Sequence, residues 1–169
     1  LWSYSVKSVY ESLCRLVPQK KDAFTMRYNE YQAKLDELDS YTMKLASSLP
    51  EGKRVLVTAH DAFNYFSRAY GFTVKGLQGI STVTEASTSD MKSLADFIAA
   101  RKLPAIFIES SVPHKNVEAL QAAVMDRGYS VGIGGELYSD AMGDEGTEDG
   151  TYVGMLRHNI DTIVNALSK

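Results

Sequence analysis

The segment Arg54-Val55-Leu56-Val57-Thr58-Ala59-His60 decides the fold class of this chain. Its short apolar run, residues 54–59, predicts a buried strand, and His60 follows one position later. Similar patterns predict three more strands, at 73–78, 105–110 and 129–133. Helices are predicted between and after them, at 61–70, 88–102, 114–127 and 151–168.

This alternation of strands and helices is typical of βαβ units in a parallel sheet with right-handed crossovers. Residues 105–108 are apolar on both faces, as expected of a central parallel strand. We therefore predict an α/β fold with a four-stranded parallel sheet and flanking helices. The last predicted helix has one apolar face, which contains Val153, Leu156, Ile160, Ile163, Val164 and Leu167.

Two helices are predicted before the first strand. Residues 1–17 form an amphipathic helix that Pro18 ends, with an apolar stripe of Trp2, Val6, Val9, Leu13 and Leu16. Asp22 is predicted to cap a second helix, and no Gly or Pro interrupts it until Pro50. From Phe24 to Leu49 it would measure about 39 Å. It is either a packed bundle or coiled-coil arm, or a stiff strut that joins two lobes.

Bulk composition describes an ordinary globular chain of 169 residues, with 44% apolar and 23% charged residues. The net charge of −3 is mild and no basic stripe occurs, so no nucleic-acid partner is expected. The single cysteine, Cys14, allows no internal disulfide and no CxxC motif. No run approaches the length of a membrane span. Because the chain starts inside a predicted helix, we expect it to be part of a longer polypeptide.

His60 and Asp140 are the candidate site residues. Asp140 follows the last predicted strand within a glycine-rich acidic loop, Gly134 to Gly150. If both strands belong to one parallel sheet, the two side chains rise from its carboxyl edge, where open α/β sheets bind ligands. One imidazole and one carboxylate make half of a transition-metal site. His114 and His158 are interpreted as surface or capping residues.

Other chemistries fit the sequence less well. Ser110 and Ser111 follow Glu109 at a strand end, but no GxSxG elbow is present and no acid is placed to orient His60 as a base. The glycines of residues 132–135 have the wrong spacing for a dinucleotide fingerprint, and GxxxxGK[ST] is absent. The acidic loop lacks the DxDxDG spacing of a calcium hand.

Four segments in fixed order resemble the metal-binding subfamily of ABC-transporter solute-binding proteins. The first segment follows the long helix and reads Leu56-Val57-Thr58-Ala59-His60-Asp61-Ala62-Phe63-Asn64-Tyr65-Phe66-Ser67. The others are Phe107-Ile108-Glu109-Ser110-Ser111, Leu137-Tyr138-Ser139-Asp140-Ala141-Met142-Gly143 and Gly150-Thr151-Tyr152. The resemblance runs the whole length of the chain.

The resemblance implies two α/β lobes joined by one rigid helix, with four side chains holding a buried metal between them. The second lobe's pair maps onto His60, a position that is His or Glu in the family, and Asp140. Glu109 and Ser110 would lie nearby, with at most a second-shell role. Both first-lobe histidines are missing, and one of them would lie just upstream of Leu1.

The domains implied are the last helix of a missing first lobe (1–21), a linking helix (22–50) and a carboxy-terminal α/β metal-binding lobe (51–169). The implied function is capture of zinc or manganese in the periplasm or cell envelope and delivery to an ABC permease, with no enzymatic activity. The alternative is a free-standing interaction or adhesin-like module with an incidental metal site or none.

Overall fold

The computed structural model describes residues 2–80 and 87–169, and it divides into two compact units, Leu1–Tyr41 and Thr42–Lys169. Leu1, the first residue of the predicted helix 1–17, lies outside the described residues. The predicted domain boundaries at residues 21 and 50 remain an interpretation based on the family resemblance.

The amino-terminal unit is helical. Helix α1 (Trp2–Leu16) is followed by a 3₁₀ turn, η1 (Pro18–Lys20), and by the start of α2 (Lys21–Ser48). Both predicted helices are therefore present, and the first ends before Pro18 as predicted. Asp22 is not the cap of α2 but lies in its first turn, because η1 leads into the helix without a break. There its charge favours the helix amino terminus.

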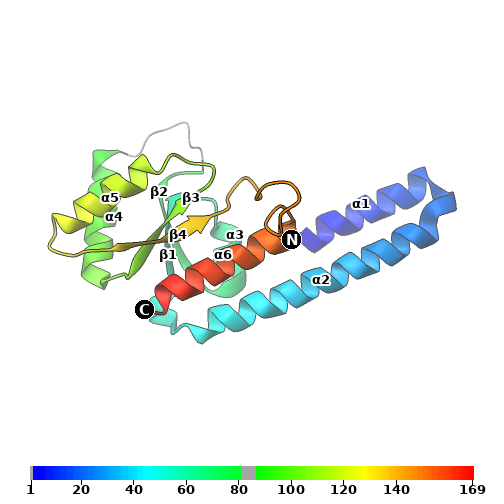
Figure 1. Ribbon diagram of the computed structural model, residues 1–169, viewed down its shortest axis with the longest axis horizontal. Coiled ribbons are helices and arrows are strands. Elements are labelled where there is room, and N and C mark those ends of the chain that lie inside the picture. The colour runs from blue at the N-terminus through cyan, green and yellow to red at the C-terminus, as the bar shows by residue number, and fades with distance from the viewer. Residues whose placement is uncertain (1, 81–86) are drawn as a thin grey trace. The chain divides into compact units, whose positions relative to one another are not determined.

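The carboxy-terminal unit alternates strands and helices, as Figure 1 shows. After a 3₁₀ turn, η2 (Glu51–Lys53), the elements are β1 (Val55–His60), α3 (Asn64–Tyr70), β2 (Thr73–Gln78), α4 (Thr88–Arg101), β3 (Ala105–Glu109), α5 (Lys115–Met125), β4 (Gly132–Leu137) and α6 (Tyr152–Leu167). The predicted α/β class is confirmed. Helix α3 starts three residues later than predicted, because a turn closed by the Ala62 N–H and the His60 carbonyl separates it from β1.

The strands run parallel in two pairs. β1 pairs with β2, from Val55 opposite Thr73 to His60 opposite Gln78, and β3 pairs with β4, ending at Glu109 opposite Leu137. β1 also lies beside β3, so the predicted four strands form two adjoining two-stranded parallel sheets. The carboxyl ends of β1, β3 and β4 consequently approach one another at one edge.

Strand β4 is the one whose position was predicted wrongly. It spans Gly132–Leu137 and not 129–133, and two of its glycines, Gly134 and Gly135, had been placed in the following loop. A Cβ on Gly134 would lie 2.6 Å from the Phe107 ring and 2.9 Å from the Ala166 Cβ, so glycine lets β4 approach its neighbours. The register shifts between Ile106 and Ile108, and the extra residue opposite them makes a β-bulge.

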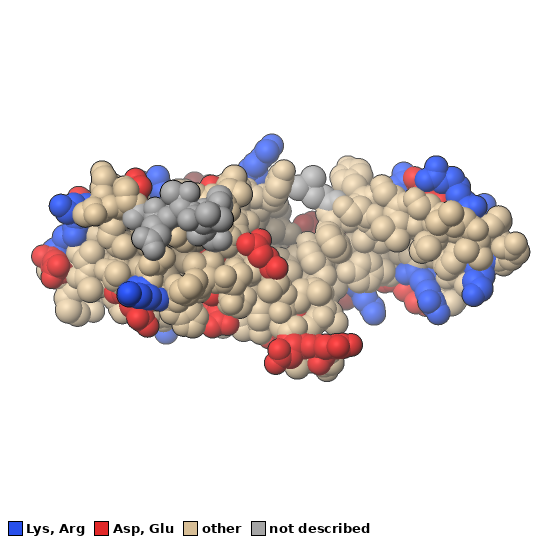
Figure 2. Space-filling view, turned by 90° about the horizontal axis from the view of Figure 1, so that it is seen from above, with Lys and Arg blue, Asp and Glu red and all other residues tan. Residues whose placement is uncertain are grey.

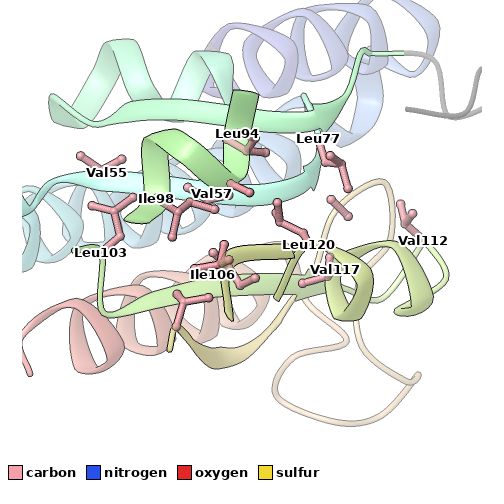
Figure 3. Close-up of a cluster of buried hydrophobic side chains, with 14 residues drawn as sticks. Val55, Val57, Leu77, Leu94, Ile98, Leu103, Ile106, Val112, Val117 and Leu120 are labelled. Carbon is pink, nitrogen blue, oxygen red and sulfur yellow. The ribbon is translucent and has the colours of Figure 1, made fainter. Parts of the chain in front are cut away.

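The main hydrophobic core lies between the strands and helices α4 and α5 (Figure 3). Val55, Val57 and Ala59 of β1 belong to it. Because strand side chains alternate between faces, His60 points to the opposite face. In Figure 1 that face carries α6, which packs against β4.

None of the helices among the described residues combines the length and apolar content that crossing a membrane requires. Basic and acidic side chains are mixed over the face drawn in Figure 2. This mixture agrees with the small net charge of the sequence.

Candidate metal centre

His60 is the last residue of β1, and its side chain is 2% exposed. Its Nε2 atom lies 3.1 Å from Oδ2 of Asp140. The structure thus brings the two candidate residues together at one edge of the strands. Their role as metal ligands stays a prediction.

Glu109 holds His60 from the other side. Its side chain is fully buried at the end of β3, and Oε1 accepts a hydrogen bond from the His60 backbone N–H at 2.8 Å. Oε2 lies 2.8 Å from Nδ1 of the ring. The two atoms are poorly aligned for a hydrogen bond, yet both are buried and neither has a hydrogen-bond partner among the described residues. We regard the pair as a close electrostatic contact, because the separation leaves no room for water between them.

This contact determines which ring nitrogen is free. A proton on Nδ1 faces the Glu109 carboxylate, which leaves the lone pair of Nε2 directed at Asp140. Histidines that bind metals nearly always carry such a partner on the second nitrogen, and it makes the first a better donor. Glu109 therefore contacts His60 on the side away from Asp140, and its expected role beside a metal ligand stays a prediction.

Asp140 is the exposed half of the pair, with 68% of its side chain accessible. Its φ of +54° lies in the left-handed region, which few residues other than glycine adopt, although Asp tolerates it better than most. Such a backbone costs roughly 1–3 kcal/mol and persists where the surroundings enforce it. This strain at the end of β4 marks a position with a special geometric role.

The acidic segment after Asp140 closes on itself. The Gly143 N–H donates to the Asp149 carbonyl and the Thr147 N–H to the Asp144 carbonyl. A Cβ on Gly150 would lie 2.2 Å from the Asp144 carbonyl oxygen, which is impossible without rearrangement. Glycine is therefore needed for the compact form of this loop, which is smaller than the predicted Gly134–Gly150 segment because residues 134–137 belong to β4.

A pocket of about 440 Å³ opens beside the pair. Its lining includes His60 and Asp140, with Tyr65 and Arg68 of α3 and the exposed Ile80 on its walls. The pocket therefore borders both residues of the pair, whereas Nδ1 of His60 faces Glu109.

The other candidates lie apart from this pair. His114 is half-exposed, 3.4 Å from Glu136, and His158 sits on α6 with Nε2 donating to the Glu136 carbonyl at 3.0 Å. The Ser111 hydroxyl pairs with that of Ser139 at 2.8 Å. His114 is exposed, as expected of a surface residue, but its side chain makes no cap hydrogen bond at the start of α5, and His158 is half-buried.

Tyr138 lies between the strand and the acidic loop. Desolvation raises the pKa of its phenol above the ordinary 10.0, and the negative charge of Asp149, 3.4 Å from the hydroxyl, adds to the rise. Asp149 also lies 3.3 Å from Nδ1 of His158. Both contacts tie the loop to its surroundings.

Asn159 is a residue that the sequence reasoning missed. It is 1% exposed on α6 and hydrogen-bonds both backbone groups of Tyr138. A signal was present, because Asn159 lies three residues after Leu156 and four before Ile163, within the apolar face of the helix. A polar residue at such a position needs a buried partner.

Two donors of different kind thus meet at the pocket, one imidazole nitrogen and one carboxylate oxygen. Within residues 2–80 and 87–169, no group of three or more His, Cys, Asp or Glu side chains could hold a metal ion. Since a closed zinc site takes four ligands, this pair alone would be half of such a site.

Known proteins resemble the chain over its whole length. The family model described as zinc-uptake complex component A, periplasmic (ZnuA), matches residues 1–166. The zinc-binding protein TroA of Treponema pallidum is 70% identical over 169 residues, which are 100% of this chain and 55% of that protein. The manganese-binding lipoprotein MntA of Bacillus subtilis is 47% identical over 167 residues, 99% of this chain and 55% of that protein.

Solved structures agree. The structure of the periplasmic zinc-binding protein TroA from Treponema pallidum superposes with a TM-score of 0.97 at 70% identity, covering 99% of this chain and 61% of that one. A second TroA structure, at 37% identity, has a TM-score of 0.93 and covers 98% of this chain and 61% of that one. The chain spans about half the length of the curated relatives it matches. These matches confirm the resemblance seen in the sequence.

Proposed function

The chain belongs to the ZnuA family of periplasmic zinc-uptake components, and from that premise we propose that it supplies part of the binding site for a transported zinc or manganese ion. His60 and Asp140 are the two ligands in this proposal. The metal is cargo, which is bound, carried and released unchanged, so no catalytic residue and no enzymatic activity are assigned.

The separation of the two donor atoms carries the proposal. Zinc lies about 2.0–2.1 Å from an imidazole nitrogen and about 2.0–2.2 Å from a carboxylate oxygen. At a tetrahedral angle, two such ligands stand about 3.3–3.5 Å apart. The observed 3.1 Å between Nε2 of His60 and Oδ2 of Asp140 needs only a small adjustment, which the exposed carboxylate can make.

The buried charge of Glu109 supports the same proposal. A carboxylate removed from water is costly unless a positive charge or hydrogen bonds compensate it. Glu109 accepts a hydrogen bond from the His60 backbone N–H and lies against the His60 ring, but no cationic side chain contacts it in the described part of the chain. A divalent ion on Nε2 would place positive charge on the far side of the imidazole and so compensate Glu109 through the ring.

The choice between zinc and manganese does not follow from this pair. Imidazole suits zinc, while a carboxylate also suits the harder manganese ion. The names of the relatives include both metals, zinc for TroA and manganese for MntA. We propose that the remaining ligands, which the rest of a longer protein would supply, decide the selectivity.

The family also suggests the partners and the location. In the proposal, the metal passes from the assembled two-lobe site to an ABC permease, at the periplasmic or outer face of a membrane. This chain covers about half of each relative's length, which supports a further lobe of the same protein as the source of the other ligands.

A zinc and manganese titration of the 169-residue chain tests the proposal. A competing fluorescent chelator reports binding by the unaltered chain and by the His60→Ala and Asp140→Ala variants. We expect weak binding that each substitution reduces, since two protein ligands leave water in the other positions. His114→Ala is the matched control, a half-exposed histidine outside the pair, and should bind as the unaltered chain does.

Circular dichroism accompanies each titration. It is needed most for His60→Ala, which leaves the buried Glu109 without its partner. Equal binding by all four proteins would refute the ligand assignment and favour the alternative, an interaction module whose metal site is incidental.

A further inference from the structure

Asn159 of α6 forms an unusual pair of hydrogen bonds at the end of β4. Its Nδ2 donates to the Tyr138 carbonyl at 2.8 Å, and its Oδ1 accepts from the Tyr138 N–H at 2.9 Å. One side-chain amide thus satisfies both groups of one residue, as a neighbouring strand would. Because Asn159 is 1% exposed, water cannot replace it easily.

This contact lies directly after the last residue of β4, where strand pairing ends. The pairing of β3 with β4 ends at Glu109 opposite Leu137, and the Ser110 N–H then donates to the Leu137 carbonyl. Tyr138, the next residue, has Asn159 in place of a strand partner. Two residues later the chain reaches Asp140.

Ser139, between them, is fixed as well. It is 6% exposed, and its hydroxyl lies 2.8 Å from that of Ser111. Tyr138 and Ser139 are therefore held by side chains from two different segments. Asp140 is the first exposed residue after them, and it is the one with φ +54°.

We propose that Asn159 is a positioning residue, which fixes the Tyr138 peptide so that the strained backbone at Asp140 directs its carboxylate toward Nε2 of His60. The claim about metal affinity rests on the proposed function, whereas the claim about the geometry at Asp140 does not. A left-handed conformation of a residue other than glycine persists only where its surroundings enforce it. Asn159 and the Ser111–Ser139 pair are the enforcing contacts that the described residues provide.

The first test is a double-mutant cycle on zinc affinity. Asn159→Ala should weaken zinc binding about tenfold, as loss of an orienting contact does at other metal sites. In the Asp140→Ala background it should cause no further loss, because the carboxylate it positions is gone. Equal losses in both backgrounds would overturn the proposal.

Two further variants separate positioning from stability. Ile163→Val removes one methylene from a fully buried residue on the same helix, without touching Tyr138, and should leave zinc affinity unchanged. If it weakens binding as much as Asn159→Ala does, general loosening of α6 explains the result and the proposal is wrong. Asn159→Asp keeps the size and the acceptor for the Tyr138 N–H but opposes two acceptors at the Tyr138 carbonyl. It should also weaken zinc binding, and it replaces Asn159→Ala in the test if the alanine variant does not fold.

The second test needs no metal. The ¹⁵N resonance of His60 Nε2 in the metal-free chain should shift in Asp140→Ala, because the carboxylate oxygen 3.1 Å away is lost. Asn159→Ala or Asn159→Asp should move the resonance part of the way in the same direction. If the chain binds no zinc, the proposed function fails while this shift still decides the role of Asn159. An unchanged resonance in a folded Asn159 variant would contradict the positioning role.

Discussion

Glu109→Gln replaces the buried carboxylate beside His60 with a neutral group of the same shape, and its effect follows from the two contacts of that carboxylate. The oxygen that accepts the His60 backbone N–H at 2.8 Å must remain an oxygen, because an amide NH₂ there would oppose two donors. The NH₂ group of the glutamine therefore takes the place of Oε2, 2.8 Å from Nδ1 of the ring.

This orientation reverses the proton on the imidazole. The NH₂ donates to Nδ1, so the neutral ring carries its proton on Nε2, the nitrogen that faces Asp140 and would bind the metal. Metal binding must then move that proton and break the new hydrogen bond. We expect zinc affinity to fall about 10- to 100-fold, as for other outer-shell partners. This loss corresponds to about 1.4–2.8 kcal/mol.

The stability of the fold should change in a different way. The substitution removes a fully buried negative charge, whose loss from water is costly, and retains the acceptor for the backbone N–H. We expect the free energy of unfolding of the metal-free chain to stay within about 1 kcal/mol of the unaltered value or to rise. Glu109→Ala, in contrast, leaves the His60 N–H without an acceptor and should cost about 1–3 kcal/mol.

A chelator competition titration gives the affinity and urea denaturation gives the stability. Glu118→Gln on the exposed side of α5 is the matched control, with the same change of charge outside the site. If Glu109→Gln binds zinc as tightly as the unaltered chain, Glu109 does not set the orientation or charge of the ring, and the reasoning fails.

Three other outcomes are expected. Gly150→Ala should lower the melting temperature, because its Cβ would lie 2.2 Å from the Asp144 carbonyl oxygen, whereas Gly52→Ala meets nothing within 4 Å and should have little effect; equal melting temperatures would contradict the compact loop. Asp149→Asn should lower the pKa of Tyr138 toward 10.0 without reaching it, since desolvation remains, as measured by alkaline ultraviolet difference spectra against Tyr138→Phe. Since the raised pKa belongs to the folded chain, the stability it contributes is present below pH 10.0 and is lost as the pH rises through the folded value. The amino-terminal helices should promote self-association, because Trp2 is 44% and Val9 59% exposed; Val9→Glu should reduce concentration-dependent sedimentation, and a monomer at all concentrations would argue against it.

The sequence predicted most of the fold because its strands carry strong local signals. The runs at 54–59, 73–78 and 105–110 are within one residue of β1, β2 and β3 at each end. β4 was misplaced because three of its six residues are glycines, which normally indicate a loop. Here glycine is required by close neighbours, Phe107 and Ala166 at Gly134 and Thr162 at Gly135, and none of them is close in sequence.

The residues of the candidate site were also predicted only in part. His60 and Asp140 were found because each follows a strand, and parallel strands bring their carboxyl ends to one edge. Asn159 was missed because it belongs to no motif and because its hydrogen-bond partner, Tyr138, lies 21 residues earlier. Its position within an apolar helix face was the available clue. The β-bulge next to Phe107 was also invisible, although it sets the register that ends at Leu137.

The two proposed ligands differ in how far they are prepared for a metal. His60 is held at its backbone and beside its ring, so little side-chain entropy remains for it to lose on binding. Asp140 has a restrained backbone but an exposed carboxylate, which can rotate to lengthen its distance from Nε2 beyond 3.1 Å. A metal entering the pocket would accept the lone pair of Nε2, keep the imidazole where it is and move the carboxylate. It follows that the contacts of Tyr138 and Ser139 matter most for Asp140, since they limit where a mobile donor can reach.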